Sequence, residues 1–154
     1  QEAREFIAVS TFLLENDATG RAIIELLTGK AREGVKVFLL LDAVGAALFS
    51  RPPDLGEFTR AGGRVARFMP MMQLPFRGRA NLRNHRKIVI ADGTQAVLGG
   101  MNIADEYMGG TESAGRWRDL SVHVRGPLVA DIYHVFRSDW AFASGDRDVG
   151  YPHG

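Results

Sequence analysis

The segment VKVFLLLD, residues 35–42, places the strongest constraint on the fold, because a short and almost continuous apolar run is typical of a strand buried on both faces. Before it, residues 6–14 (FIAVSTFLL) have the composition of another strand. Residues 20–33 lie between the two with the periodicity of a helix, which Gly34 would end. This order of elements predicts a βαβ unit, in which parallel strands are covered by helices.

The rest of the chain extends this unit into a larger sheet. Asp92-Gly93-Thr94 separates two strand-like segments, KIVIA and QAVLG, and predicts a tight antiparallel hairpin. The further elements that we expect are a helix near residues 53–61, strands at 64–69, 87–91, 95–99 and 117–124, and a helix that begins at Gly126-Pro127. This last helix is expected to bury Leu128 or Val129, with Ile132, Val135, Phe136 and Trp140.

These patterns predict one α/β domain over residues 1–154, with a mixed β-sheet flanked by helices on both faces. A composition of 45% hydrophobic residues suits one packed core at this length. The formal charge of +1 means that any binding of anions depends on local clusters of basic residues. The chain has no cysteine, which excludes thiolate catalysis, and no apolar run of the roughly 20 residues that a membrane-spanning helix needs. Because it does not start with methionine, we expect a piece of a longer protein.

The segment HRKIVIAD places His85, Lys87 and Asp92 in the pattern H-x-K-x4-D. On a strand, His85 and Lys87 project from the same side, while Ile88 and Ile90 pack against the core. A neutral imidazole is a nucleophile toward phosphorus, and an ammonium group binds the non-bridging oxygens of a phosphate. Asp92 falls on the opposite face of the strand, so we predict a structural role for it in fixing the turn.

Two further residues are predicted to belong to this site. Asn102 follows Gly99-Gly100, and its amide is expected to donate to a phosphoryl oxygen; the alternative is an ordinary turn asparagine. Asp119 is expected to accept a hydrogen bond from the His85 ring and so to fix its tautomer; the alternative is an ion pair with Arg116 or Arg118. Since these side chains supply the donors for the phosphate, we expect no metal and no cofactor.

Basic and apolar residues lie directly before the motif. The residues expected to bind a phosphate or headgroup are Arg77, Arg79, Arg83 and Arg86. The residues expected to contact lipid are Phe68, Met71, Met72, Leu74 and Phe76. The alternatives are a solvated charged loop for the first group and core packing for the second.

The pattern H-x-K-x4-D, followed by Gly-Gly-Met-Asn, resembles the HKD signature of the phospholipase D superfamily. The segments REFIAVSTFLLENDATG, FRGRANLRNHRKIVIADG and WRDLSVHVRGP also resemble the first half of bacterial cardiolipin synthases of the phospholipase D type. The resemblance implies a phospholipase D-like domain in which His85 carries a phosphatidyl group taken from phosphatidylglycerol. It also implies a second motif that completes the site, and the chain contains one such motif only.

Three hypotheses follow from this resemblance. The favoured one is the N-terminal half of a bacterial, membrane-associated phosphatidyltransferase, completed by a second HKD half in cis. The second is a one-motif phosphodiesterase or nuclease that closes its site as a homodimer. The third is a noncatalytic module that binds lipid or another anion. The apolar residues before the motif favour the first hypothesis, and the presence of His85, Lys87 and Asn102 together counts against the third.

Overall fold

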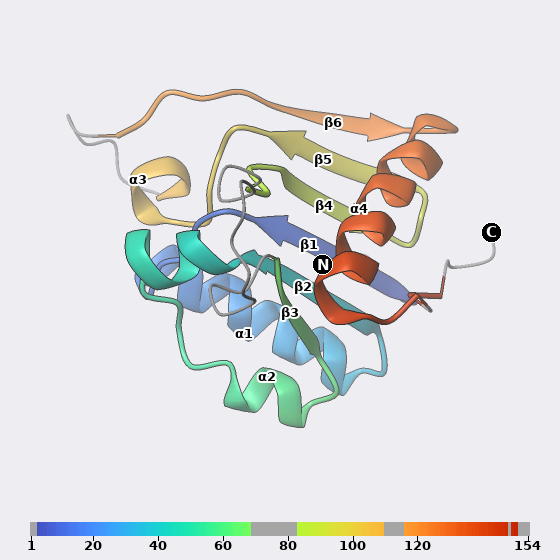
Figure 1. Cartoon of the computed structure of the whole chain (residues 1–154), viewed down its shortest axis with the longest axis horizontal. Helices are drawn as coiled ribbons and strands as arrows, with labels where there is room; N and C mark the ends of the chain where they lie inside the picture. Colours follow the sequence, from blue (N-terminus) through green and yellow to red (C-terminus); the bar gives the residue numbers. More distant parts are fainter. Residues whose placement is uncertain (1–2, 69–82, 110–115, 148, 151–154) are drawn as a thin grey trace, which may run out of the picture.

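The computed structural model describes residues 3–68, 83–109, 116–147 and 149–150. Within these residues, the strands form one sheet in the order β3-β2-β1-β4-β5-β6, so that β3 and β6 are its edges (Figure 1). The elements in chain order are β1 (Phe6–Thr11), α1 (Ala18–Arg32), β2 (Lys36–Asp42), η1 (Gly45–Phe49), α2 (Gly56–Arg60), β3 (Arg64–Phe68), β4 (Lys87–Ala91), β5 (Gln95–Gly99), α3 (Asp105–Met108), β6 (Ser121–Arg125) and α4 (Leu128–Ser144).

The first half of the sheet is parallel and contains the predicted βαβ unit. β1 pairs with β2, and β2 pairs with β3, all in the same direction. Asp17 caps the start of helix α1, because its side chain accepts a hydrogen bond from the peptide nitrogen of Gly20. The chain turns after α1 at Gly34, which has a φ of 87°, a conformation that glycine adopts without strain.

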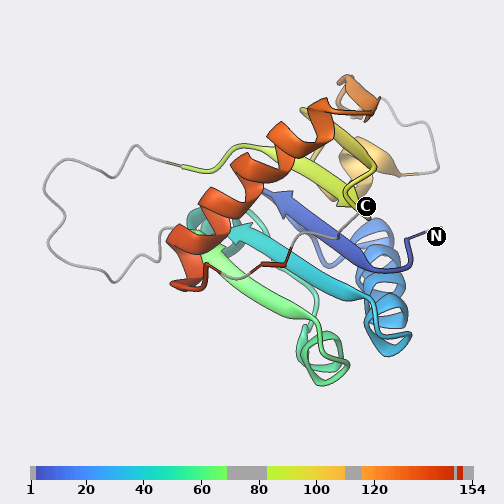
Figure 2. The same ribbon diagram turned by 90° about the vertical axis from the view of Figure 1, so that its right-hand side faces the viewer.

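Helices cover both faces of the sheet, as predicted. Figure 2 shows α4 across one face and α1 with α2 against the other. On the α1 side, alternate strand residues such as Val9 and Leu39 pack with Leu27. On the α4 side, the intervening residues such as Phe38 pack with Trp140. β1 and β2 are therefore buried on both faces, which explains their continuous apolar sequences.

The second half of the sheet is antiparallel. β4 lies between β1 and β5, and β6 pairs with the outer side of β5. The predicted hairpin between β4 and β5 turns at Asp92 and Gly93, with φ values of 50° and 61°. Two successive positive φ values are typical of the turns that match the twist of a β-hairpin.

Several predicted boundaries were wrong. β1 ends at Thr11 rather than at residue 14, because the next residues turn to pair with Ile103. β6 begins at Ser121, so that residues 117–120 precede the strand. In α4, Val135 is exposed and Tyr133 is buried instead, because the positions that face the sheet follow Val129 at intervals of three and four residues.

Sequence reasoning did not predict the π-helical turn η1 or the short helix α3. No helix in the described part of the chain combines the length and the apolar character needed to cross a membrane.

Candidate active site

The residues predicted for catalysis gather at one end of the sheet, where β1 and β5 end and β4 begins, at the left of Figure 1. The His85 ring stacks on the ring of Phe12, with the ring centroids 4.0 Å apart and the planes 17° apart. Lys87 Nζ lies 5.7 Å from the centroid of the same Phe12 ring and donates a hydrogen bond of 2.8 Å to the carbonyl oxygen of His85. The imidazole and the ammonium group therefore share one aromatic support.

Asp119 approaches this group from the segment before β6. Burial lowers the pKa of Lys87, and the negative charge of Asp119 opposes that shift. The Asp119 carboxylate lies directly against Gly100, where a Cβ atom would stand 2.2 Å from Asp119 Oδ2. The absence of a side chain at Gly100 is what allows the carboxylate to occupy this place.

The predicted hydrogen bond between Asp119 and the His85 ring is absent: no described residue forms a hydrogen bond with this imidazole. Asp119 instead accepts a hydrogen bond of 2.7 Å from the peptide nitrogen of Leu120. Among the described residues, neither Arg116 nor Arg118 forms an ion pair with it. The negative charge of Asp119 acts on Lys87, whose pKa it raises.

Asn102 is buried, with 5% of its surface exposed, and its amide has a defined orientation. Its Oδ1 accepts a hydrogen bond of 3.1 Å from the peptide nitrogen of Leu13. A peptide nitrogen only donates, so the amide oxygen must face Leu13 and the Nδ2 group points elsewhere. No described residue accepts a hydrogen bond from Nδ2. The dipeptide Phe12-Leu13 thus contacts both His85 and Asn102.

The chain segment that carries His85 is held by buried polar groups that sequence reasoning missed. Asp42, at the end of β2, accepts a hydrogen bond of 3.0 Å from the peptide nitrogen of Asn84 through Oδ2. Its other oxygen accepts hydrogen bonds from the peptide nitrogens of Val44 and Gly45. One carboxylate, 1% exposed, therefore joins the approach to His85 to the start of η1.

A second set of contacts holds the residues on either side of His85. Asn84 Nδ2 and Arg86 Nη1 each donate a hydrogen bond of 2.9 Å to Oδ2 of Asp139 on α4. Asn84 Oδ1 accepts a hydrogen bond of 3.1 Å from the peptide nitrogen of Arg86. Burial raises the pKa of Asp139, against the opposing effects of Arg86 and of these hydrogen bonds. We call Asp42, Asn84, Arg86 and Asp139 the His85 clamp.

The sequence profile of the family described as "Cardiolipin synthase, PLD-like domain" matches residues 1–140. The chain belongs to this family. Cardiolipin synthase A of Pseudomonas putida (strain W619) is 39% identical to this PLD-like domain over 145 residues, which are 94% of this chain and 30% of that protein. Cardiolipin synthase of Clostridium perfringens (strain 13) is 38% identical over 149 residues, 96% of this chain and 31% of that protein. The PLD-like domain thus spans about a third of the length of these relatives.

A solved structure has the same fold. Nuc from Salmonella typhimurium, a phospholipase D family member, superposes with a TM-score of 0.65 at 14% sequence identity. The match covers 92% of this chain and 82% of that chain. At this identity the similarity shows the fold alone, and it confirms the phospholipase D-like architecture expected from the sequence.

Asp92 lies at the other end of β4 of the PLD-like domain, away from His85. Its carboxylate accepts hydrogen bonds from the peptide nitrogens of Arg4, Glu5 and Phe6, at the start of β1. Although burial alone would raise the pKa of Asp92, these hydrogen bonds outweigh it and lower the pKa. The side chain therefore joins the hairpin turn to the first strand.

The predicted headgroup and lipid contacts are only partly within the described residues. Arg86 belongs to the His85 clamp, and Nη1 of Arg83 is buried with no hydrogen-bond partner among the described residues. Phe68 ends β3 and contacts the ring of Phe142 on α4, with centroids 5.2 Å apart. The residues that lie outside the described ranges are Met71, Met72, Leu74, Phe76, Arg77 and Arg79.

Proposed function

We propose that this domain is one half of a phosphatidyltransferase, in which His85 carries the phosphatidyl group between two alcohols. The observation that carries the proposal is the convergence of His85, Lys87 and Asn102 around Phe12-Leu13. An imidazole, a cation and an oriented amide therefore lie at one end of the sheet. Such a set suits a phosphodiester, whose transition state has negative charge on its non-bridging oxygens.

In the first step, a neutral ring nitrogen of His85 attacks the phosphorus of phosphatidylglycerol, and the bond from phosphorus to the glycerol oxygen breaks. The histidine of a second motif gives its proton to the departing glycerol. In the second step, that histidine removes a proton from the acceptor hydroxyl, which attacks phosphorus and releases His85. Lys87 and Asn102 would donate hydrogen bonds to the non-bridging oxygens throughout.

The mechanism needs two motif histidines, and this sequence contains one H-x-K-x4-D motif. We therefore propose that another HKD half completes the site. The names of the relatives support phosphatidyl transfer, since both are called cardiolipin synthases. A phospholipid substrate implies that the enzyme acts at a bacterial membrane surface. There, the basic residues near the motif would bind the headgroup and the apolar residues from Phe68 to Phe76 would contact acyl chains.

We propose supporting roles for the two motif carboxylates. Asp119 would favour the charged form of Lys87 rather than fix the tautomer of His85, because its negative charge raises the pKa of the ammonium group. Asp92 would hold the hairpin against β1 through its three peptide hydrogen bonds. Neither carboxylate would touch the substrate.

A second candidate function is a one-motif phosphodiesterase or nuclease that acts as a homodimer. The observation that favours it is the match to Nuc. This chain covers 82% of the Nuc chain, whereas it covers only 30% of the cardiolipin synthase of P. putida. A domain of this size therefore makes up most of one solved member of the fold.

A paired assay tests both candidates. The chain is incubated with phosphatidylglycerol vesicles and, separately, with plasmid DNA without metal, alongside the variants His85→Ala and His134→Ala. His134 is exposed on α4 and lies outside the site, so its variant is the matched control. Lipid transfer that is lost only in His85→Ala supports the transferase, and DNA nicking with the same dependence supports the nuclease. Turnover that survives in His85→Ala would overturn the proposed nucleophile.

A further inference from the structure

The turn η1 exposes two adjacent bulky apolar side chains beside the candidate active site. Leu48 is 65% exposed and Phe49 is 63% exposed, whereas Gly45 and Ala46 of the same turn are buried. We call Leu48 and Phe49 the apolar tip. Exposing two adjacent large apolar side chains to water costs free energy, and such a patch is typical of a surface that binds a partner or a membrane.

Phe49 of the apolar tip packs on the same aromatic ring as His85. The Phe49 and Phe12 ring centroids are 6.3 Å apart, and the His85 ring stacks on the same Phe12 ring. The turn also approaches the residue that follows β1, because a Cβ atom at Gly45 would stand 2.0 Å from the carbonyl oxygen of Phe12. The carboxylate of Asp42 binds the start of η1 and the peptide of Asn84 together.

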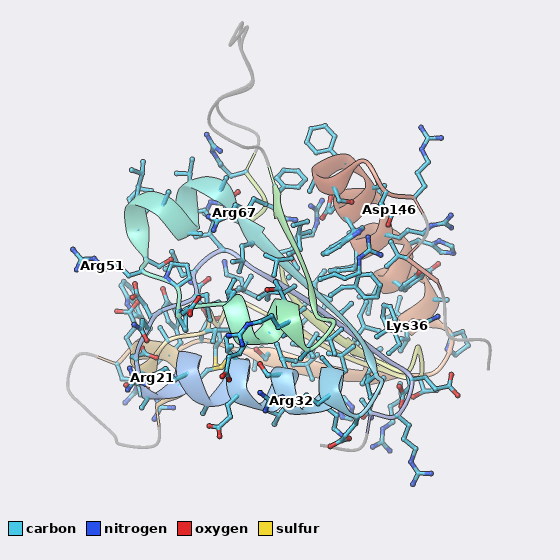
Figure 3. All side chains as sticks on the ribbon, turned by 90° about the horizontal axis from the view of Figure 1, so that it is seen from below. Arg21, Arg32, Lys36, Arg51, Arg67 and Asp146 are labelled. Atoms are coloured by element: carbon cyan, nitrogen blue, oxygen red, sulfur yellow. The ribbon has the colours of Figure 1, made fainter. Side chains whose placement is uncertain are left out.

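Positive charge accompanies this turn. Arg51 follows η1, and Figure 3 shows its side chain pointing away from the body of the molecule. Glu15 binds the peptide nitrogen of Arg51, and no described residue forms an ion pair with the Arg51 guanidinium. An apolar tip beside a cation is complementary to a bilayer that contains anionic lipid.

We propose that the apolar tip inserts into the acyl region of an anionic phospholipid bilayer and so brings the lipid phosphate to His85. This inference rests on the proposed function and adds the surface that meets the membrane. A second copy of the chain is a poorer occupant, because two side chains of this exposure offer on the order of 250 Å². A stable protein interface takes roughly 800 Å² from each partner.

The absence of cysteine in the chain gives a direct test. A single cysteine is introduced at the tip, Phe49→Cys, and is labelled with an environment-sensitive fluorophore. The matched control is Leu128→Cys, because Leu128 is 54% exposed and begins α4 at the opposite end of the sheet (Figure 1). Vesicles of phosphatidylglycerol with phosphatidylcholine are then added to each labelled chain.

We expect a blue shift of the emission, and quenching by nitroxide-labelled acyl chains, for the label at residue 49 and not for the label at residue 128. In vesicle sedimentation, Leu48→Ser with Phe49→Ser should weaken binding by about tenfold or more, and Leu128→Ser should leave it unchanged. No binding by the unlabelled chain, equal shifts at both positions, or unchanged binding by the double variant would each overturn the proposal. None of these measurements needs turnover, so their failure is distinct from failure of the transferase.

Discussion

Replacing Asn84 by alanine should destabilise the domain and loosen His85. The variant removes the hydrogen bond from Nδ2 to Asp139 and the one that Oδ1 accepts from the Arg86 peptide, while the backbone contact to Asp42 remains. A hydrogen bond to a charged group contributes about 1.5–3 kcal/mol and a neutral one about 1 kcal/mol. Since Arg86 is partly accessible to water, we expect a loss of about 2–3 kcal/mol in the free energy of unfolding.

Urea denaturation followed by tryptophan fluorescence measures this loss, because Trp140 is buried and reports on the core. For a domain of this size, the expected loss corresponds to a fall in Tm of about 4–12 °C. The matched control is Glu57→Gln, which removes an exposed ion pair with Arg32 that contributes about 0–1 kcal/mol.

The local effect is read from the NMR signal of the His85 ring, which the stacked Phe12 ring should shift. In Asn84→Ala, we expect that shift to shrink as the imidazole leaves the Phe12 ring for part of the time. A loss of stability below about 0.5 kcal/mol, or a destabilised variant in which the His85 signal keeps its position, would refute the argument that the His85 clamp positions this ring.

Three other substitutions test the remaining contacts. Asp119→Asn should lower the pKa of Lys87 further, since the Asp119 charge raises it; an unchanged NMR titration of the Lys87 side chain would contradict the pairing. Gly100→Ala should change the free energy of unfolding by less than about 1 kcal/mol in urea denaturation, because the exposed Asp119 side chain can move away from the added Cβ atom; a larger loss would show that Asp119 is held in place. Asp92 has a lowered pKa, so its stabilisation is present above the unfolded-state pKa, about 3.9, and is lost as the pH falls through the lower folded-state pKa. Asp92→Asn should reduce that acid dependence of stability, and an unchanged profile between pH 5 and about 2 would exclude this role.

The parts of the fold that the sequence predicted depend on local patterns. The apolar run ending at Asp42 and the turn at Asp92-Gly93 each specify one element through neighbouring residues, and the order of the elements predicts a mixed α/β sheet. The phospholipase D-like fold is implied by the resemblance of the H-x-K-x4-D motif to the HKD signature. The π-helical turn η1 has no comparable periodic signature. Its conformation depends on Asp42 and on the close approach of Gly45 to Phe12, which only the folded chain brings together.

The candidate site divides in the same way. Strand alternation predicts a shared side for His85 and Lys87, and both lie on the Phe12 ring, although β4 begins at Lys87 and His85 precedes it. Asn84 and Asp139 are 55 residues apart, and neither has a local pattern that indicates the contact. The sequence predicts the imidazole as the partner of Asp119, whereas in the folded chain the Asp119 charge acts on Lys87, and the spacing along the chain does not distinguish the two.

The position of β4 beside β1 has a consequence for folding during synthesis on the ribosome. Ser10 at the end of β1 pairs with Ile88, so the edge of β1 stays open until most of the domain has been synthesised. Phe12, on whose ring His85 stacks, is therefore synthesised long before His85. A nascent chain stalled before residue 83 would present an unsatisfied β1 edge to chaperones, and the HKD histidine would join the site only when the β4–β5 hairpin docks.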